Sequence, residues 1–309
     1  MVLAAQVRVK EIRMEKKSAP VEIALNNVSV SYPVTSSGRK TVLSNINLNI
    51  YPGEFVAVLG VTGCGKSTLL RLVLGQEFPM SGTIVVDGKH VNRIDSRCGY
   101  VPQKYSLFPD RTMIENVMYG PENAHCGWLA RLLPSYRTFK RTLRIQAEEQ
   151  LVRMGLRASD LNKYPHQLSG GMQQRVAIAQ ALMMKPPVLL MDEAFSALDP
   201  STRASLQQQL REIWQETRPT VLFVTHNTSE ALLLGTRLII LGPHREGSQE
   251  SNVLLDIPLP QSSDTISVRK QSTEFHELRE FVKLRAYGAS HSNDELRVLP
   301  ELTERGEAL

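Results

Sequence analysis

Gly60, Gly63 and Gly65 lie at the spacing of a loop that wraps around phosphate, and Lys66 and Ser67 follow them directly. Glycines let successive backbone N–H groups point inward at a phosphate, and the helix end that follows favours the same negative charge. A lysine here reaches the β- and γ-phosphates, while a serine hydroxyl is an oxygen ligand for Mg²⁺. The alternative is a glycine-rich turn without a ligand. An apolar run before the loop and leucines at helical spacing after it favour the phosphate site.

The predicted nucleotide contacts within this phosphate loop are Gly60, Thr62, Gly63, Cys64, Gly65, Lys66, Ser67 and Thr68.

Two carboxylates, Asp192 and Glu193, end a fully apolar run at residues 188–191. The run is typical of a buried parallel strand. Acids at the end of such a strand cost free energy unless a metal ion or water satisfies them. A hard cation among phosphates prefers carboxylate oxygen, so we expect Asp192 to hold Mg²⁺ through water.

Together with the loop, further stretches resemble, in order, the motifs of ATP-binding-cassette (ABC) ATPases. Residues 168–175 (Leu-Ser-Gly-Gly-Met-Gln-Gln-Arg) resemble the signature motif, and residues 188–193 resemble the Walker B strand at the spacing of that family. The remaining matches are Tyr32 for the aromatic that stacks on adenine, Gln103 for the Q-loop glutamine, 196–199 for the D-loop and His226 for the switch histidine. The resemblance covers about residues 22–242, and a signature within an ordered motif set is highly specific.

The resemblance implies ATP as the nucleotide and a role for each matched residue. Glu193 is expected to be the general base that polarises the attacking water. Gln103 would contact both Mg²⁺ and water, and so report whether the γ-phosphate is present. The imidazole of His226 would bond the γ-phosphate and orient Glu193 or the water. Outside this motif order, Gln103, His226 and Tyr32 would be interpreted as ordinary surface or core residues.

Ser169, Gly170 and Gly171 offer a hydroxyl and free backbone N–H groups at the start of a helix predicted to begin near Met172. Because the chain already has a phosphate loop, a second anion site indicates phosphate held by another chain. In the resembled family two cassettes pair head-to-tail. We therefore expect a homodimer in which each signature closes on the partner's ATP.

Two positions depart from the pattern of the family. Ala194 follows Glu193 where many transporter members have proline, and Gln180 stands where arginine is frequent. Neither position carries a proton or a metal ligand, so we expect hydrolysis to be preserved.

Strands that alternate with helices around a phosphate loop predict an α/β fold. The predicted class is a P-loop NTPase with a mostly parallel core sheet, an antiparallel β subdomain and an inserted α-helical subdomain. Fully apolar runs predict buried strands, and alternating runs predict half-buried ones. The buried strands are expected at residues 55–59, 188–191, 221–224 and 238–241, and the half-buried ones at 21–32 and 42–50.

We divide the chain into a tail at 1–20, a nucleotide-binding domain at 21–245 and an acidic extension at 246–309. The helical subdomain occupies about 104–184. The tail is interpreted as a loose segment or a first edge strand. The extension has a polar, serine-containing start and a plausible amphipathic helix near 274–287. We expect its deletion to leave the motif set intact.

An inserted segment at 121–144 interleaves apolar with basic side chains. They are Trp128, Leu129, Leu132, Leu133, Tyr136 and Phe139 beside Arg131, Arg137, Lys140, Arg141 and Arg144. Such a pattern could rest on a membrane surface or on nucleic acid. A helical hairpin packed on its own domain is favoured, because the segment is short and Pro134 interrupts it.

Charge and cysteine content narrow the possible classes of protein. Residues 246–309 carry 7 Lys and Arg against 12 Asp and Glu, so the chain's net +5 leaves +10 on residues 1–245. A basic body could meet nucleic acid, an anionic membrane or only solvent, and the absence of long basic runs favours a solvated surface. Cys64, Cys98 and Cys126 lie far apart, which argues against disulfides and zinc and fits a reducing cytosol.

The sequence also predicts no membrane-spanning segment. The N-terminus has no apolar core of signal-peptide length, and the apolar run at 231–242 is interrupted by Arg237 and too short to cross a bilayer.

These features favour the ATPase subunit of an importer, peripheral on the cytoplasmic face of the plasma or inner membrane. Integral permease subunits would be separate chains contacted beside Gln103, at residues 104–110, and a periplasmic or extracellular solute-binding protein would act indirectly. Residues 168–181 and 191–200 most resemble importers of nitrate, sulfonate, taurine and bicarbonate.

An exporter or lipid-extraction ATPase is the alternative. A soluble ATPase of repair or translation is disfavoured, because about a hundred residues without sustained heptads separate the loop from the signature. We therefore expect no nucleic-acid partner.

Overall fold

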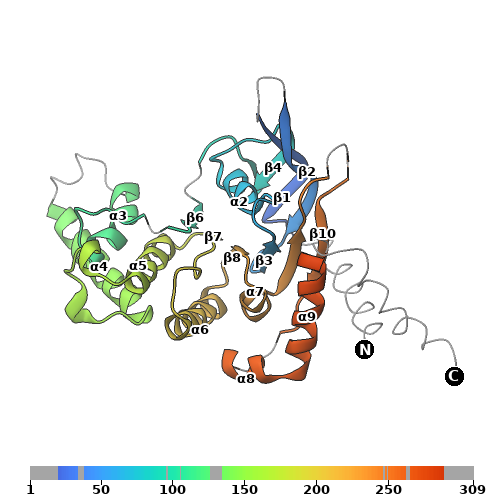
Figure 1. Ribbon diagram of the computed structural model, residues 1–309. Coiled ribbons are helices and arrows are strands. Elements are labelled where there is room, and N and C mark those ends of the chain that lie inside the picture. Colours follow the sequence, from blue (N-terminus) through green and yellow to red (C-terminus); the bar gives the residue numbers. More distant parts are fainter. Residues whose placement is uncertain are drawn as a thin grey trace.

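The computed structural model describes residues 20–33, 38–94, 97–104, 106–125, 134–245, 248, 250–261 and 265–288 (Figure 1). The predicted tail at 1–20 falls outside these residues except for Pro20. The apolar side chains of the insertion from Trp128 to Leu133 also fall outside them, as does Cys126. Among the described cysteines, Cys64 and Cys98 are free thiols.

A six-stranded sheet with the order β10-β9-β3-β8-β7-β6 forms the centre of the molecule. All neighbouring pairs are parallel except β10 with β9, which is antiparallel. Three of the strands are buried at every residue, as their continuous apolar sequences predict. The strands are β3 (Phe55–Gly60), β6 (Cys98–Val101), β7 (Val188–Asp192), β8 (Thr220–Thr225), β9 (Arg237–Leu241) and β10 (Val253–Pro258).

A four-stranded antiparallel sheet with the order β2-β1-β4-β5 packs beside the central sheet. Its long strands alternate buried and exposed residues, so one face joins a core shared with helix α2 (Lys66–Leu74). The Asp87-Gly88 turn joins two of its strands, with both residues at positive φ. The strands are β1 (Ile23–Pro33), β2 (Arg39–Ile50), β4 (Ser81–Val86) and β5 (Lys89–His90). The predicted mixed α/β class is confirmed.

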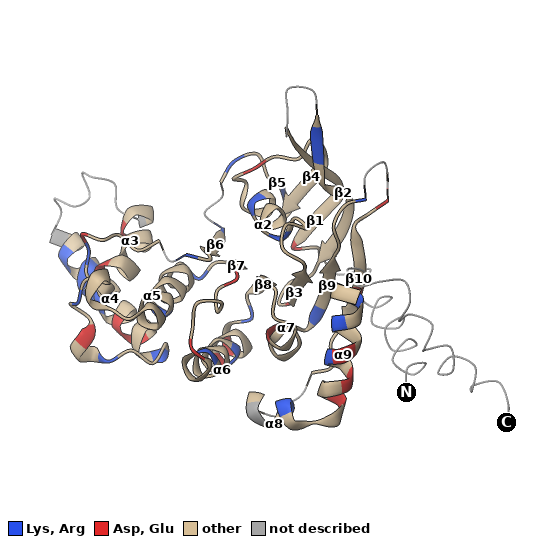
Figure 2. Ribbon diagram, in the orientation of Figure 1, with Lys and Arg blue, Asp and Glu red and all other residues tan. Residues whose placement is uncertain are grey.

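Three helices form a lobe at one side of the central sheet (Figure 1). They are α3 (Met113–His125), α4 (Pro134–Arg153) and α5 (Gly170–Met183), and short 3-10 turns at Ala158–Asp160 and Pro165–Gln167 lead into α5. Tyr136 and Phe139 of the insertion lie in α4, where Phe139 packs against the buried core. Lys and Arg are spread along α4 (Figure 2). The described part of the insertion therefore includes a helix packed on its own domain.

Beyond residue 245 the chain adds to the central sheet. β10 pairs with β9, and the chain continues into α8 (Ile266–Gln271) and α9 (Thr273–Tyr287). The sequence predicted the second helix but not the strand or α8. Helices α6 (Pro200–Thr217) and α7 (Thr228–Leu234) complete the described elements.

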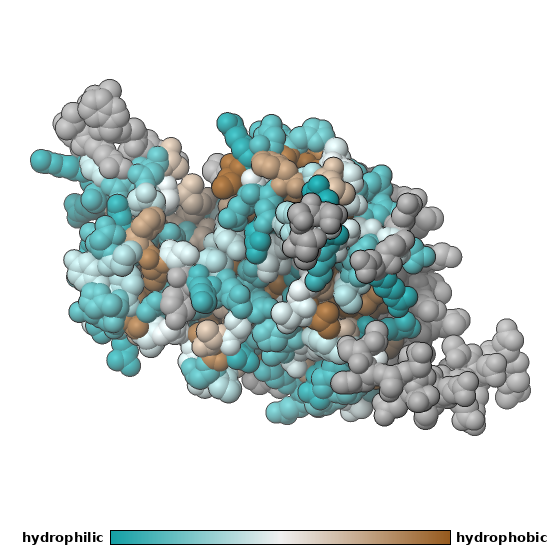
Figure 3. All heavy atoms as spheres, turned by 45° about the horizontal axis from the view of Figure 1, so that its top comes forward, coloured by the Kyte–Doolittle hydropathy of each residue, from teal (hydrophilic) through white to brown (hydrophobic). Residues whose placement is uncertain are grey.

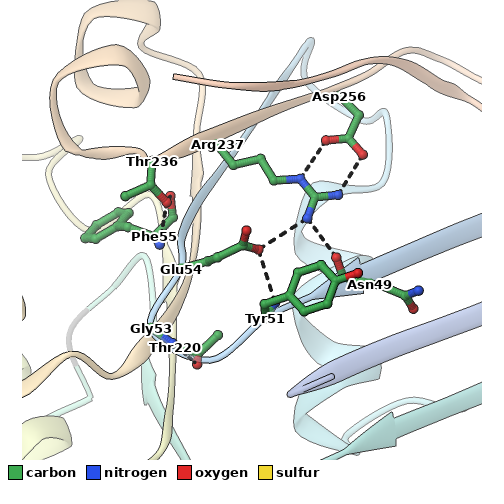
Figure 4. Close-up of polar contacts among 9 residues, drawn as sticks. All are labelled: Asn49, Tyr51, Gly53, Glu54, Phe55, Thr220, Thr236, Arg237 and Asp256. Atoms are coloured by element: carbon green, nitrogen blue, oxygen red, sulfur yellow. Dashed lines mark hydrogen bonds and ion pairs between the residues drawn. The ribbon is translucent and has the colours of Figure 1, made fainter. Parts of the chain in front are cut away.

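Arg237 joins β10 to the sheet through a half-buried ion pair (Figure 4). Its guanidinium donates two hydrogen bonds of 2.7 Å to Asp256 of β10 and further bonds to Glu54 and to the carbonyl of Asn49. Burial opposes the charge on Arg237, yet Asp256 and Glu54 keep its pKa above the ordinary value. β10 is thus held by ion pairs as well as by its backbone ladder.

Within the described residues, no helix is both long enough and apolar enough to cross a bilayer. On the face that Figure 3 presents, hydrophobic residues occur in separate areas among hydrophilic ones.

Candidate active site

Four parallel strands end at one edge of the central sheet, and each delivers one predicted motif. Leu59 is paired with Thr225, Val224 with Asp192 and Met191 with Val101. The carboxyl ends of β3, β8, β7 and β6 therefore lie side by side. Such an edge is where open α/β sheets bind ligands.

The phosphate loop leaves β3 at Gly60 and enters α2 at Lys66. Two of its glycines are required by the backbone. A Cβ atom on Gly60 would lie 2.3 Å from the carbonyl oxygen of Leu241, and Gly65 has a φ of 103°, a conformation that other residues rarely adopt. Gly65 precedes the first residue of α2, so backbone N–H groups of this turn are at the helix N-terminus.

Lys66 is buried and bonded within its own loop. Its ammonium donates to the carbonyl oxygens of Gly60 at 2.9 Å and Val61 at 3.0 Å. The side chain therefore curls under the loop rather than reaching into solvent. Cys64 is also buried, and burial raises the pKa of its thiol.

Ser67 and Asp192 meet at the start of α2. The Ser67 hydroxyl donates to Asp192 Oδ1 at 3.1 Å, which joins the phosphate loop to the end of β7. Burial raises the pKa of Asp192 against the opposing hydrogen bond from Ser67. A buried carboxylate beside a hydroxyl is an all-oxygen donor pair that fits Mg²⁺, with phosphate and water completing the shell.

The other two predicted catalytic side chains, Gln103 and His226, both contact Glu193. Gln103 Nε2 donates to Glu193 Oε2 at 3.0 Å, and His226 Nδ1 lies 3.1 Å from the same oxygen. Glu193 itself has a φ of 46°, in the left-handed region, and its N–H donates to the carbonyl of Val224. A glutamate held at this rare backbone angle between two other motif residues is typical of a functional position.

Tyr32, near the end of β1, contacts helix α2. Its hydroxyl shares a 3.2 Å hydrogen bond with Thr68 Oγ1 and donates to Glu77 Oε2. Burial, followed by the bond to Glu77, raises its pKa. Glu77 in turn pairs with Arg71 at 2.7 Å. Glu77 and Arg71 belong to no motif, so this ion pair could not be predicted from the sequence.

The signature residues lie in the helical lobe, away from α2 and the phosphate loop of the same chain (Figure 1). Ser169 caps α5 by accepting a hydrogen bond from Met172 N at 3.3 Å. The helix begins at Gly170, so the predicted start near Met172 was two residues late. The serine cap permits the earlier start although two glycines follow it.

A half-buried ion pair between Arg203 and Glu230, next to two of the motif segments, has no signal in the sequence. Arg203 Nη2 donates to the carbonyl of Leu198 in the D-loop at 2.8 Å, and its Nε lies 3.7 Å from Glu230. Glu230 accepts from Thr225 Oγ1 at 2.7 Å, directly before His226. The pKa of Glu230 is raised by burial. This ion pair therefore links the D-loop to the segment that carries the switch histidine.

Comparison with known proteins identifies the family. A family model described as ABC transporter matches residues 43–196. The "Bicarbonate transport ATP-binding protein CmpD" of Synechocystis is 39% identical over 84% of this chain and 86% of the relative. The "Nitrate import ATP-binding protein NrtC" of Synechococcus elongatus is 38% identical over 84% of this chain. The aligned part spans 37% of that longer protein.

A solved structure agrees with the sequence relatives. It is described as the dimeric post-hydrolysis state of the ATP-binding cassette MJ0796 bound to ADP and Pi. It superposes with a TM-score of 0.62 at 34% identity, over 74% of this chain and 99% of that one. The predicted family, fold class and ATPase activity are therefore confirmed. The chain belongs to the ATP-binding subunits of ABC transporters, ATPases whose hydrolysis is coupled to transport, and it resembles the import subunits among them.

Proposed function

We propose that this chain hydrolyses ATP at the edge formed by β3, β8, β7 and β6, and so powers import of a small anion through separate membrane subunits. One observation carries the hydrolytic part of the proposal. A single carboxylate oxygen of Glu193 accepts a hydrogen bond from Gln103 and faces the imidazole of His226. This oxygen belongs to the residue after Asp192, which is bonded to Ser67. This geometry supports a water-activating carboxylate beside a phosphate site.

Binding of the triphosphate would fall to the phosphate loop. Lys66 is held by two neutral carbonyl oxygens, which phosphate oxygens can replace with stronger, charge-assisted bonds. Backbone N–H groups from Thr62 to Thr68 would surround the β-phosphate at the N-terminus of α2. The ring of Tyr32, anchored by its hydroxyl to Thr68, would stack on the base.

Hydrolysis would depend on Glu193 and on the two side chains that contact one of its carboxylate oxygens. Glu193 would take the proton of the attacking water, and Gln103 and His226 would hold its carboxylate in place while touching the γ-phosphate side of the site. Ser67, Asp192 and Gln103 would hold Mg²⁺. When bound, Mg²⁺ neutralises charge on the phosphates.

A second copy would complete the site. Ser169, Gly170 and Gly171 lie in the helical lobe, apart from their own phosphate loop, so they are available to the ATP of a partner. The solved relative described as dimeric supports cassette pairing. ATP would then act as a ligand that favours the closed dimer, and hydrolysis would release it.

The direction and cargo are inferred from relatives. Two relatives are named for bicarbonate transport and nitrate import, which supports a small anion as cargo and does not favour export. The surface at 104–110, between Gln103 and α3, would contact the permease at the cytoplasmic face of the membrane. A solute-binding protein would deliver the anion to the permease.

Reconstitution tests this proposal. The membrane protein that co-purifies with this chain would be placed in vesicles, with ATP on the side of the chain and labelled bicarbonate or nitrate on the other, together with its solute-binding protein. We expect ATP-dependent movement of solute toward the ATP side, lost in Glu193→Gln and kept in the exposed control Glu149→Gln. Movement away from the ATP side would overturn import, and co-purification of nucleic acid or ribosomes would overturn transport.

A further inference from the structure

Tyr287, the last residue of α9, contacts the segment that carries the switch histidine. Its hydroxyl donates a 2.7 Å hydrogen bond to the backbone carbonyl of His226. The same hydroxyl is hydrogen-bonded to the side chain of Thr228. Tyr287 thus contacts both His226 and Thr228, the two neighbours of Asn227, although it lies 61 residues after His226 in the sequence.

Helix α9 is a rigid support for this hydroxyl. Ser272 caps its start by accepting from Phe275 N at 3.2 Å. Phe275, Val282 and Ala286 are buried in the same core as β3 and α7. A side chain that emerges from a packed helix can hold its partner within a narrow range of positions.

The contact lies close to the reaction centre. Burial raises the pKa of Tyr287, and the negative charge of the Glu193 carboxylate contributes in the same direction. His226 carries its Nδ1 3.1 Å from Glu193, while 56% of its side chain is exposed. An exposed imidazole on a short connection between β8 and α7 needs its backbone held if the ring is to stay on that oxygen.

Other contacts hold the neighbours of His226 within their own segment. Asn227 N donates to Thr225 Oγ1 at 3.0 Å, and Ser229 N donates to Asn227 Oδ1 at 2.9 Å. Tyr287 comes instead from the C-terminal extension. It lies well outside residues 43–196, which match the family model.

We propose that Tyr287 is a positioning residue for His226, so that the C-terminal helix α9 forms part of the hydrolytic unit. The inference rests on the proposed role of His226 in hydrolysis. Tyr287 acts through the backbone, since its hydroxyl bonds the carbonyl of His226 and not the imidazole. Its loss releases the carbonyl of His226 and lets the imidazole leave Glu193 for part of the time, which lowers the rate of hydrolysis without removing a phosphate contact.

Tyr287→Phe tests the proposal, because it removes one oxygen and keeps the ring. A neutral hydrogen bond of this kind corresponds to about a three- to tenfold change in rate. We expect kcat to fall by about that factor, with ATP affinity within about twofold and the thermal unfolding midpoint nearly unchanged. Tyr119→Phe is the matched control. That ring lies in α3 against Phe108 and Arg111, and the variant should keep the wild-type kcat.

A double-mutant cycle with His226→Ala separates positioning from a general structural role. With the imidazole gone, Tyr287→Phe should lower the residual turnover no further. An equal loss in both backgrounds, or an unchanged kcat in Tyr287→Phe alone, would overturn the inference. If His226→Ala itself hydrolysed ATP at the wild-type rate, the proposed role of the histidine would fail instead.

Discussion

Replacing Glu193 with glutamine removes a proton acceptor while keeping the shape of the site. Gln103 Nε2 and His226 Nδ1 both approach one oxygen of this carboxylate, at 3.0 and 3.1 Å. The amide oxygen of glutamine can accept both contacts from the same position. The two bonds lose charge assistance but not geometry. Binding of ATP should therefore survive the change, and only the chemical step should be lost.

The expected loss of turnover in Glu193→Gln is that of general base catalysis alone, because ATP binding is retained. General base catalysis is worth about 10²- to 10⁴-fold in rate, or roughly 3–5 kcal/mol of the barrier at 1.36 kcal/mol per tenfold. The affinity for ATP should stay the same or increase, because a negative charge has been removed from beside the phosphates. Slow hydrolysis with retained binding should accumulate the ATP-bound dimer.

Three measurements check the prediction for Glu193→Gln. Phosphate release at saturating ATP gives the turnover, equilibrium titration gives the affinity, and light scattering after size exclusion gives the oligomeric state. Glu149→Gln, the same change on the exposed side of α4, should match the wild type in all three. Turnover within tenfold of wild type would refute the assignment of Glu193 as base. A monomer at saturating ATP would refute the two-chain site.

Three further variants test the binding loop, the metal site and the sheet edge. Lys66→Ala should weaken ATP affinity at least about tenfold in equilibrium titration, because charge-assisted bonds to phosphate are lost. The exposed control Lys89→Ala should keep the wild-type affinity. Unchanged affinity in Lys66→Ala would contradict the assigned contact. Asp192→Asn should abolish most turnover yet raise the thermal midpoint of the nucleotide-free protein at pH 8. Burial raises the pKa of this carboxyl, so its ionised form destabilises the fold, and the gain should vanish as the pH falls below the ordinary value of 3.8. Arg237→Ala should cost about 3 kcal/mol in urea unfolding, because it leaves the buried carboxylate of Glu54 and the half-buried one of Asp256 without their cation. Arg153→Ala at an exposed ion pair should cost less than about 1 kcal/mol, and equal losses in the two variants would show that burial does not matter.

The edge of the sheet that holds the site could be predicted because its signals are local. In β3 and β7 a short apolar run leads directly into predicted site residues, as Gly60 follows Leu59 and Asp192 follows Met191, while Gln103 and His226 lie two residues after the apolar ends of β6 and β8. Parallel pairing then places the ends of these strands together without further information.

The parts that were missed depend on contacts between distant residues. β10 is a six-residue strand that ends in Pro258, and nothing in its own sequence reveals that it pairs with β9. Its Asp256 has meaning only beside Arg237, 19 residues earlier. The sequence predicted a helix near 274–287, but helical periodicity cannot say which loop the hydroxyl of Tyr287 reaches.

The pairing of β10 also changes what a truncation would do. Deletion of residues 246–309 was expected to leave the motif set intact. In the structure it would remove the edge strand of the central sheet and uncover β9, whose residues from Leu238 to Leu241 are fully buried. It would also leave Arg237 without Asp256. Lost activity in such a truncation would report unfolding, so the Tyr287 variant is the cleaner probe of the extension.

Three segments of the chain meet at one carboxylate oxygen of Glu193, which contacts Gln103 and His226. Gln103 leads into the helical lobe, and Glu193 leads through the D-loop into α6. His226 leads into α7, which α9 braces through Tyr287. Any change in the charge or partners of this carboxylate alters contacts to all three elements together. Interfaces between packed elements shift between discrete arrangements rather than deforming continuously. With Glu193 as the base that we propose, the proton that it takes would change its contacts to Gln103 and His226 in one step.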